Sequence, residues 1–238
     1  MSAFLYGVTL QWKLDIRSKD ILISYYLIPL VMFAVMGGVL TSIMPDMQGT
    51  VIQSMTIFGV SMGAFTGLPA SLVQIYGSDI KNVYKANGVP LSLGVITHFL
   101  SAFIHLFIMS LIIFFAAPLL FGAVHPANLP LYFGGLAMFI AASLAIGSAL
   151  GVLVKEQAKS AMISQLFFLP SVMLSGAMFP ADMLPTAFSY IGRAVPATWG
   201  KLLMSSEVFH LGYFIPLVVM FGVATVICGI ALSRNVKA

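Results

Sequence analysis

Six long apolar runs without a charged side chain constrain the fold of this chain more than any other feature. The runs cover residues 21–43, 51–75, 91–115, 131–154, 161–179 and 211–232, and none contains Asp, Glu, Lys or Arg. About 20 apolar helical residues cross a bilayer core that is about 30 Å thick. Lipid favours helices, because they satisfy their own backbone hydrogen bonds, and the strands of a membrane barrel would alternate apolar and polar residues. We therefore expect an all-α polytopic membrane protein with six transmembrane helices.

The eleven basic residues predict how these helices are oriented. Nine of them lie before the first run, at 76–90, at 155–160 or after the last run, and only Arg193 and Lys201 lie in the other connections. Because basic residues accumulate in short cytoplasmic loops, this asymmetry predicts that both termini are cytoplasmic. The basic residues form no cluster, so topology explains the net charge of +4 and we expect no nucleic-acid partner.

Residues 1–20 differ from the runs because they mix apolar and charged side chains. Four apolar residues recur there at helical spacing, namely Leu5, Val8, Trp12 and Ile16. The pattern favours an N-terminal interfacial amphipathic helix over a disordered tail. Charges follow the short apolar stretch, which is the reverse of a cleavable signal peptide, so we expect this segment to be retained. Residues 21–238 are expected to form the six-helix membrane domain.

The connection at 180–210 is too apolar for an ordinary exposed loop. Proline and glycine divide it into short pieces, so we expect two short interfacial helices or a re-entrant hairpin on the outer side, not a seventh span. The residues that mark this region are Phe179, Pro180, Pro185, Pro196 and Trp199. The region either gates a pathway or packs as a lid, and the sequence favours neither interpretation.

The most informative polar connection has the sequence GSDIKNVYKANGVP and covers residues 77–90. Ser78 or Asp79 can cap a short helix, and Gly88 with Pro90 can end it. An apolar face flanked by charges predicts that this helix docks in a groove of a partner protein, although it could also lie flat on lipid headgroups. The predicted contact residues are Asp79, Ile80, Lys81, Val83, Tyr84 and Lys85.

Catalytic and ligand-binding motifs do not emerge from the sequence. Gly200 and Lys201 lack the rest of a phosphate-binding loop, so we do not expect this chain to bind ATP by itself. His98 and His105 share one face of the third run, but without a carboxylate or third ligand in the run they favour internal hydrogen bonding over a metal site or proton relay. The runs hold no acid for a Ser-His-acid arrangement, so we predict no catalytic residue, no metal and no enzymatic activity. The single Cys228 excludes an intramolecular disulfide.

Small residues recur at every fourth position in two of the runs. The second run contains Gly59, Gly63 and Gly67, and the fourth contains Ser143, Gly147 and Gly151. Such stripes allow membrane helices to approach closely. We favour packing within one subunit, although one stripe could serve a subunit interface.

The order of these parts resembles the permease subunits of ABC-2 type transporters, a family of bacterial exporters of drugs, antibiotics and polysaccharides. The resemblance spans nearly the whole chain and includes the stretch LPSVMLSGAMFPADMLPTAFSYIGRAVPATW at 169–199. This stretch is similar to the family's close of the fifth span, which is an apolar run ending in Ser-Gly, then Phe-Pro, a spaced Leu-Pro and a final Pro-x-Thr. The sequence QIYGSDIKNVYKANG at 74–88 departs from the acidic, arginine-rich run of many relatives, which leaves the partner contacts open.

The resemblance implies a permease of the bacterial cytoplasmic membrane that pairs with a second permease subunit, as a homodimer or heterodimer, and binds two copies of a separate ATP-binding subunit. ATP and Mg²⁺ would be held by that subunit, so this chain would carry no cofactor, and the helix within 77–90 would be its coupling helix.

The exported substrate would be a small lipophilic or amphipathic molecule. A drug or peptide antibiotic, as in efflux and antibiotic resistance, is favoured over a polysaccharide or lipid-linked glycan. An ion-coupled secondary transporter is the alternative of another class, but the runs offer no charged residue on which an ion gradient could act.

The charge asymmetry generates a prediction of topology. In a Cys228→Ala background, a cysteine placed at Thr186 should react with a membrane-impermeant thiol reagent in intact cells, and a cysteine placed at Lys237 should be shielded. Shielding at Thr186 together with reaction at Lys237 would show that the topology is reversed.

Overall fold

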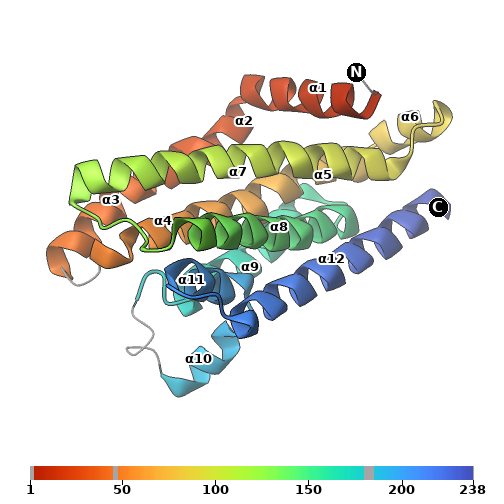
Figure 1. Ribbon diagram of the computed structural model, residues 1–238. Helices are drawn as coiled ribbons and strands as arrows, with labels where there is room; N and C mark the ends of the chain where they lie inside the picture. The colour runs from red at the N-terminus through yellow and green to blue at the C-terminus, as the bar shows by residue number, and fades with distance from the viewer. Residues whose placement is uncertain (1–2, 45–47, 180–184, 238) are drawn as a thin grey trace.

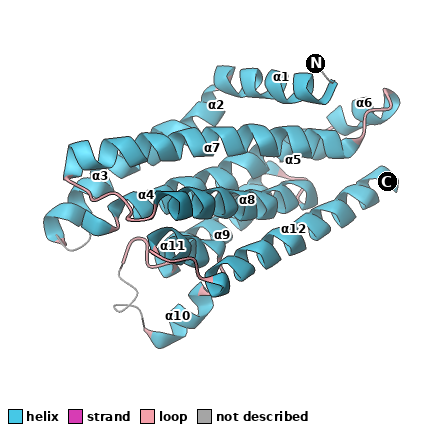
Figure 2. Cartoon of the chain, viewed as in Figure 1, coloured by secondary structure: helices cyan, strands magenta, loops and turns pink. Residues whose placement is uncertain are grey.

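The computed structural model describes residues 3–44, 48–179 and 185–237, and every regular element in these ranges is a helix (Figure 1, Figure 2). The first two spans and their flanks comprise α1 (Ala3–Arg17), α2 (Lys19–Leu22), η1 (Ile23–Leu27), α3 (Ile28–Ile43), α4 (Val51–Met62), η3 (Gly63–Gly67), α5 (Leu68–Tyr76) and α6 (Ile80–Ala86). The remaining helices are α7 (Leu91–Phe121), α8 (Leu129–Leu153), α9 (Gln157–Leu174), α10 (Thr186–Gly192), α11 (Pro196–Ser205) and α12 (Leu211–Lys237). The prediction of an all-α fold is confirmed.

Five helical stretches in the described residues are long and apolar enough to cross a membrane. They are Lys19–Ile43, Val51–Tyr76, Leu91–Phe121, Leu129–Leu153 and Leu211–Arg234. These stretches confirm a polytopic membrane protein. The remaining predicted span corresponds to α9, whose first turns carry Gln157 and Lys159 and are therefore less apolar. A count of six transmembrane helices stays a prediction.

The predicted end of the fifth run at residue 179 is wrong for the helix, because α9 ends at Leu174. The backbone N–H of Ala177 donates to Ser175 Oγ at 3.3 Å, and Gly176 has a φ of 76°. Glycine adopts this left-handed conformation without the steric cost that a Cβ brings, so the chain turns out of the helix here. The apolar residues up to Phe179 belong to the following turn.

The first and second spans each contain a π-helical turn just before a proline. η1 precedes Pro29, and η3 precedes Pro69. Proline donates no backbone hydrogen bond and crowds the preceding turn, and a wider turn is one adjustment that satisfies the freed backbone groups. The two wide turns contact each other. Tyr25 of η1 is buried there, with its ring against Gly63 and Gly67 of η3.

The second span forms the centre of the bundle, and its neighbours approach it closely at glycine. Side chains of α7 and η1 occupy the space beside Gly59, Gly63 and Gly67. From α8, Gly147 meets the backbone of Ala64, and Gly151 meets Pro69 and Leu72, while Ser143 is buried on the same helix. The structure therefore places both predicted stripes in contacts within one chain.

The ends of the bundle separate two groups of short helices. α6 lies at the same end of the bundle as the C-terminal end of α12, whereas the α7–α8 connection lies at the opposite end (Figure 1). α10 and α11 are the two short helices between α9 and α12, as the apolar connection at 180–210 predicts. The bundle therefore has α6 at one end, and α10 and α11 follow the C-terminal end of α9 in the chain.

Close packing at α8 generates a prediction about stability. A Cβ at Gly147 would overlap the carbonyl oxygen of Ala64, so Gly147→Ala should lower the free energy of unfolding by about 1–3 kcal/mol. Gly134 lies on the same helix, and a Cβ there would meet no atom within 4 Å. Gly134→Ala is therefore the matched control and should be neutral or stabilising by up to about 1 kcal/mol. Apparent thermal midpoints of the purified proteins measure both effects, and equal midpoints for the two variants would contradict the contact.

Candidate functional site

α6 is a short helix with defined start and stop signals. The backbone N–H of Ile80 donates to Ser78 Oγ at 3.3 Å at its start. At its end Gly88 has a φ of 65°, and the N–H of Val89 donates to the carbonyl oxygen of Tyr84 at 2.9 Å. This hydrogen bond closes the last turn in the manner of a Schellman motif, which requires glycine or a similarly permissive residue. The sequence therefore fixes both the length and the exit direction of α6.

The predicted apolar face of α6 is divided in the structure. Ile80 is 46% exposed and Val83 is 60% exposed, whereas Tyr84 packs against the buried core. The other predicted contact residues flank the exposed pair, with Asp79 and Lys85 exposed and Lys81 half-buried. Exposed aliphatic side chains beside charges form a surface that a protein groove can cover. Ile80 and Val83 are therefore the apolar residues available to a partner, and Tyr84 attaches α6 to the bundle.

The segments on both sides of α6 are tied to the spans. The hydroxyl of Tyr76, at the end of α5, donates to the carbonyl oxygen of Leu91 at 2.5 Å, at the start of α7. Gly77 lies against the carbonyl of Lys155, in the turn between α8 and α9, so closely that a Cβ would overlap it. Short contacts on both sides of α6 therefore join the end of α5 to the start of α7 and to the turn between α8 and α9.

Two polar cavities, of about 70 and 100 Å³, lie beside α5 and share Ala70 in their lining; together they are called the polar groove. Its polar side chains are Thr66, Ser71 and Gln74 from η3 and α5, Ser18, Asp20 and Ser24 from the start of the first span, and Gln157, Ser160, Ser164 and Gln165 from α9. Asp20 is the one carboxylate among the described residues of the lining. Polar side chains within membrane helices usually face a water-filled cavity or another protein. The groove is therefore a candidate for a pathway or a subunit interface.

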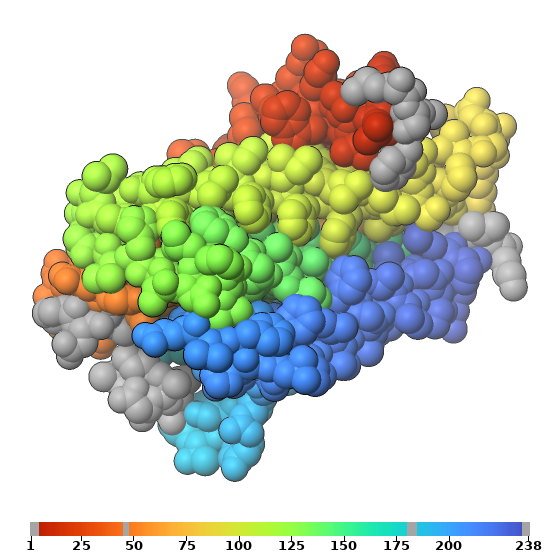
Figure 3. Space-filling view, viewed as in Figure 1, coloured from red at the N-terminus to blue at the C-terminus, as the bar shows by residue number. Residues whose placement is uncertain are grey.

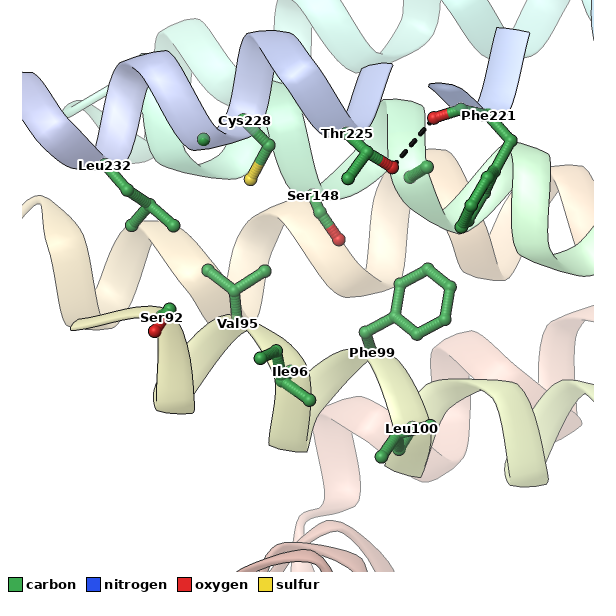
Figure 4. Close-up of a pocket in the computed structure, with 12 residues that line it drawn as sticks. Ser92, Val95, Ile96, Phe99, Leu100, Ser148, Phe221, Thr225, Cys228 and Leu232 are labelled. Carbon is green, nitrogen blue, oxygen red and sulfur yellow. Dashed lines mark hydrogen bonds between the residues drawn. The ribbon is translucent and has the colours of Figure 1, made fainter. Parts of the chain in front are cut away.

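An apolar cavity of about 410 Å³ lies between α7, α8 and α12 (Figure 4). Aliphatic and aromatic side chains form most of its wall, including Val95, Phe99 and Phe221. One of its hydroxyl groups is already used within the chain, since Thr225 Oγ1 donates to the Phe221 carbonyl oxygen at 2.8 Å. Such a cavity has the size of a small-molecule site and suits an apolar group.

Helix α1 is packed against α7 through a buried carboxylate. Asp15 is 3% exposed, and its two oxygens accept hydrogen bonds from Ser101 Oγ at 2.5 Å and Gln11 Nε2 at 2.7 Å. Only part of the predicted apolar stripe faces α7, because Leu5 and Ile16 are exposed whereas Val8 and Trp12 are half-buried. A charged residue is buried only when its hydrogen bonds are satisfied, and Ser101 supplies that partner. The sequence places Ser101 between two histidines but gives no signal that Asp15 reaches it.

The two histidines of α7 make hydrogen bonds within the bundle. His105 Nδ1 is 2.8 Å from the hydroxyl of Tyr26, and the His105 ring stacks with Trp12 at 6.1 Å between ring centroids. His98 Nδ1 is 2.9 Å from the carbonyl oxygen of Gly94. Across residues 3–44, 48–179 and 185–237, no three His, Cys, Asp or Glu side chains come together as a possible metal site. Asp15 therefore adds an acid beside the histidines without creating a metal-binding cluster.

The region between α9 and α12 surrounds a cavity of about 720 Å³. Trp199 donates from Nε1 to the carbonyl oxygen of Arg193 at 2.8 Å, and Lys201 Nζ donates to the carbonyl oxygen of Gly176. Burial lowers the pKa of Lys201, because desolvation penalises its ammonium group. Two of the other residues predicted to mark this region lie at helix starts: Pro185 directly precedes α10, and Pro196 is the first residue of α11. Phe179 is exposed, and Pro180 lies outside the described residues.

The chain was compared with known protein families. Residues 3–206 match the family model described as ABC-2 type transporter. The matched range includes α6, the polar groove, the Asp15 contact and the short helices α10 and α11. No curated protein matches the chain.

The buried carboxylate generates a prediction about the attachment of α1. Asp15→Ala leaves the hydroxyl of Ser101 and the amide of Gln11 without their acceptor, so the free energy of unfolding should fall by about 1–3 kcal/mol. Asp20→Ala, which removes an exposed carboxylate, is the matched control and should change it by less than about 0.5 kcal/mol. The apparent thermal midpoint measures both variants, and an unchanged midpoint for Asp15→Ala would refute the role of the contact.

Proposed function

The chain belongs to the ABC-2 type transporter family and is a membrane-spanning permease subunit that works with an ATP-binding ABC subunit; from this premise we propose that it exports its substrate from the bacterial cytoplasm. Both termini would lie in the cytoplasm, as the distribution of basic residues suggests. In the assembled exporter, two copies of the ATP-binding subunit hold ATP and Mg²⁺. The present chain then supplies the pathway and the surface that responds to the nucleotide state.

The exposed pair Ile80 and Val83 on α6 carries this proposal. Burying them in a groove of the ATP-binding subunit would remove apolar surface from water, which favours association. Asp79 and Lys85 beside them can set the orientation of the contact, since charged groups at the rim act on specificity more than on affinity. Motion of α6 would then pass through Tyr76 and Gly77 to the spans.

The polar groove along α5 supports a second permease subunit, in a homodimer or heterodimer. Two such grooves facing each other would enclose the side-chain amides of the lining and the hydroxyl of Ser160, which has no hydrogen-bond partner in the described residues; the hydroxyls of Thr66 and Ser71 already donate to carbonyl oxygens of their own helix. Asp20 would give this path a negative charge at its cytoplasmic end. An amphipathic substrate with a cationic part, such as a drug or peptide antibiotic, fits that chemistry better than a neutral polysaccharide or lipid-linked glycan.

The buried Asp15 is the feature that favours the alternative of an ion-coupled secondary transporter. A carboxylate among membrane helices is a typical ion or proton site. Its two hydrogen bonds, to Ser101 and Gln11, attach α1 to α7 and account for it structurally. Transport that persisted without ATP but collapsed with the ion gradient would favour the alternative.

The α6 surface generates a prediction about partner binding. Replacing Ile80 and Val83 together by Asp places charges in the apolar contact, so association with the ATP-binding subunit should weaken by at least about 2 kcal/mol, or about thirtyfold. Asn82→Asp adds a charge at an exposed position of the same helix that faces away from the pair, and it is the matched control. Co-purification and substrate efflux are measured with membrane abundance held equal. Normal association and efflux in the double variant would show that α6 lies on lipid instead.

The groove generates a prediction about pairing. In a Cys228→Ala background, a cysteine at the exposed Gln165 should cross-link to a second permease subunit, because it lies on the groove wall. A cysteine at Phe115, which is 63% exposed on α7, is the control and should not. The mass of the cross-linked product identifies the partner. Cross-linking at Phe115 alone would place the interface on another face.

A further inference from the structure

The cavity between α9, α10, α11 and the start of α12 has a lining unlike that of the other cavities. It measures about 720 Å³ and combines two cations, two aromatic rings and six serine or threonine hydroxyl groups. The described residues of the lining are Thr50, Leu174, Ser175, Ser189, Arg193, Thr198, Trp199, Lys201, Leu202, Ser205, Ser206 and Tyr213. No carboxylate is among these described residues. The cavity therefore favours an anionic group.

Lys201 is the more deeply placed of the two cations. Its ammonium group donates to the carbonyl oxygen of Gly176. This hydrogen bond uses one of the three N–H donors of Lys201. The described part of the chain offers Lys201 no ion pair, since the salt bridge found there joins Lys159 and Glu156. Desolvation of a cation is offset only by hydrogen bonds and opposite charge. An anion in the cavity would supply both.

Arg193 places its charge beside an apolar surface. Its guanidinium lies over the ring of Tyr190 at 5.1 Å from the centroid, and none of the guanidinium N–H groups has a hydrogen-bond partner in the described residues. On α10, which ends directly before Arg193, Phe188, Tyr190 and Ile191 are between 47% and 65% exposed. α10 projects from the body of the molecule, as Figure 3 shows. A ligand with an anionic head and an apolar body would match the cavity and this neighbouring surface together.

We propose that this cavity binds the phosphate group of an anionic membrane phospholipid, with Arg193 and Lys201 as its cationic partners and the lipid chains along the exposed side of α10. Arginine and lysine are the usual phosphate-binding side chains, and hydroxyl groups such as those of Ser189 and Ser205 add neutral donors. A phospholipid at the membrane interface presents its phosphate beside apolar chains. The site does not depend on which molecule the transporter exports.

The experiment is native mass spectrometry of the full-length protein in detergent with added phosphatidylglycerol or phosphatidylcholine. Phosphatidylglycerol should bind more tightly, because the choline cation is repelled by Arg193 and Lys201. Arg193→Gln and Lys201→Met should each raise its dissociation constant about tenfold, which corresponds to one lost charged hydrogen bond. Lys201→Arg, which keeps the charge, should retain binding. Lys159→Gln, which alters an exposed lysine paired with Glu156, is the matched control and should bind like the parent protein.

Inorganic phosphate distinguishes the two sources of the anion. Displacement of phosphatidylglycerol by phosphate would show that the site recognises the phosphate group of the lipid. Phosphate binding without any preference between the two lipids would assign the site to the free anion and overturn the proposal. Arg193 is exposed, so its variant tests the proposal even if Lys201→Met does not fold. Equal binding of the two lipids without phosphate competition, or unchanged binding in Arg193→Gln, would overturn it as well.

Discussion

Close backbone contact with the second span determines how the rest of the bundle is arranged. Lipid provides no hydrophobic force between helices, so their association depends on packing and on polar contacts. Because Gly59 and Gly63 have no side chain, side chains of α7 pack directly against the second span there. Because Gly147 and Gly151 of α8 have none, the backbone of the second span lies directly against α8. The π-helical turns η1 and η3 meet at the same level. A central helix held on several sides can shift only together with its neighbours.

This packing links the short helix α6 to the central span. α6 follows the central span directly, and Tyr76 joins the end of that span to the start of α7. Gly77 brings the turn between α8 and α9 into the same contact. A partner that moved α6 through Ile80 and Val83 would therefore act on the span that positions the others. The polar groove along α5 lies on that same span, which connects the proposed docking surface to the proposed pathway.

The sequence predicts the helices far better than it predicts the contacts between them. Uncharged runs and terminal signals locate the first spans and α6 closely, since hydropathy and glycine conformation act locally. The apolar pattern misplaces the end of α9, because apolar residues after Gly176 extend the run although the backbone turns there. The sequence assigns Asp15 to an interfacial helix, because no local pattern shows that its carboxylate meets Ser101 eighty-six residues away. Tyr84 likewise belongs to an amphipathic pattern, and only tertiary packing turns it toward the core.

As an ABC-2 type permease, this chain is proposed to take the energy for transport from a separate ATP-binding subunit. The most direct measurement is ATP hydrolysis by the purified chain in lipid vesicles, alone and after addition of its ATP-binding subunit. We predict no turnover by the chain alone, because its sequence has no phosphate-binding loop, and substrate-stimulated turnover by the assembled complex. Sustained ATP hydrolysis by the rigorously isolated chain, or substrate transport that needs no ATP-binding subunit, would contradict the account.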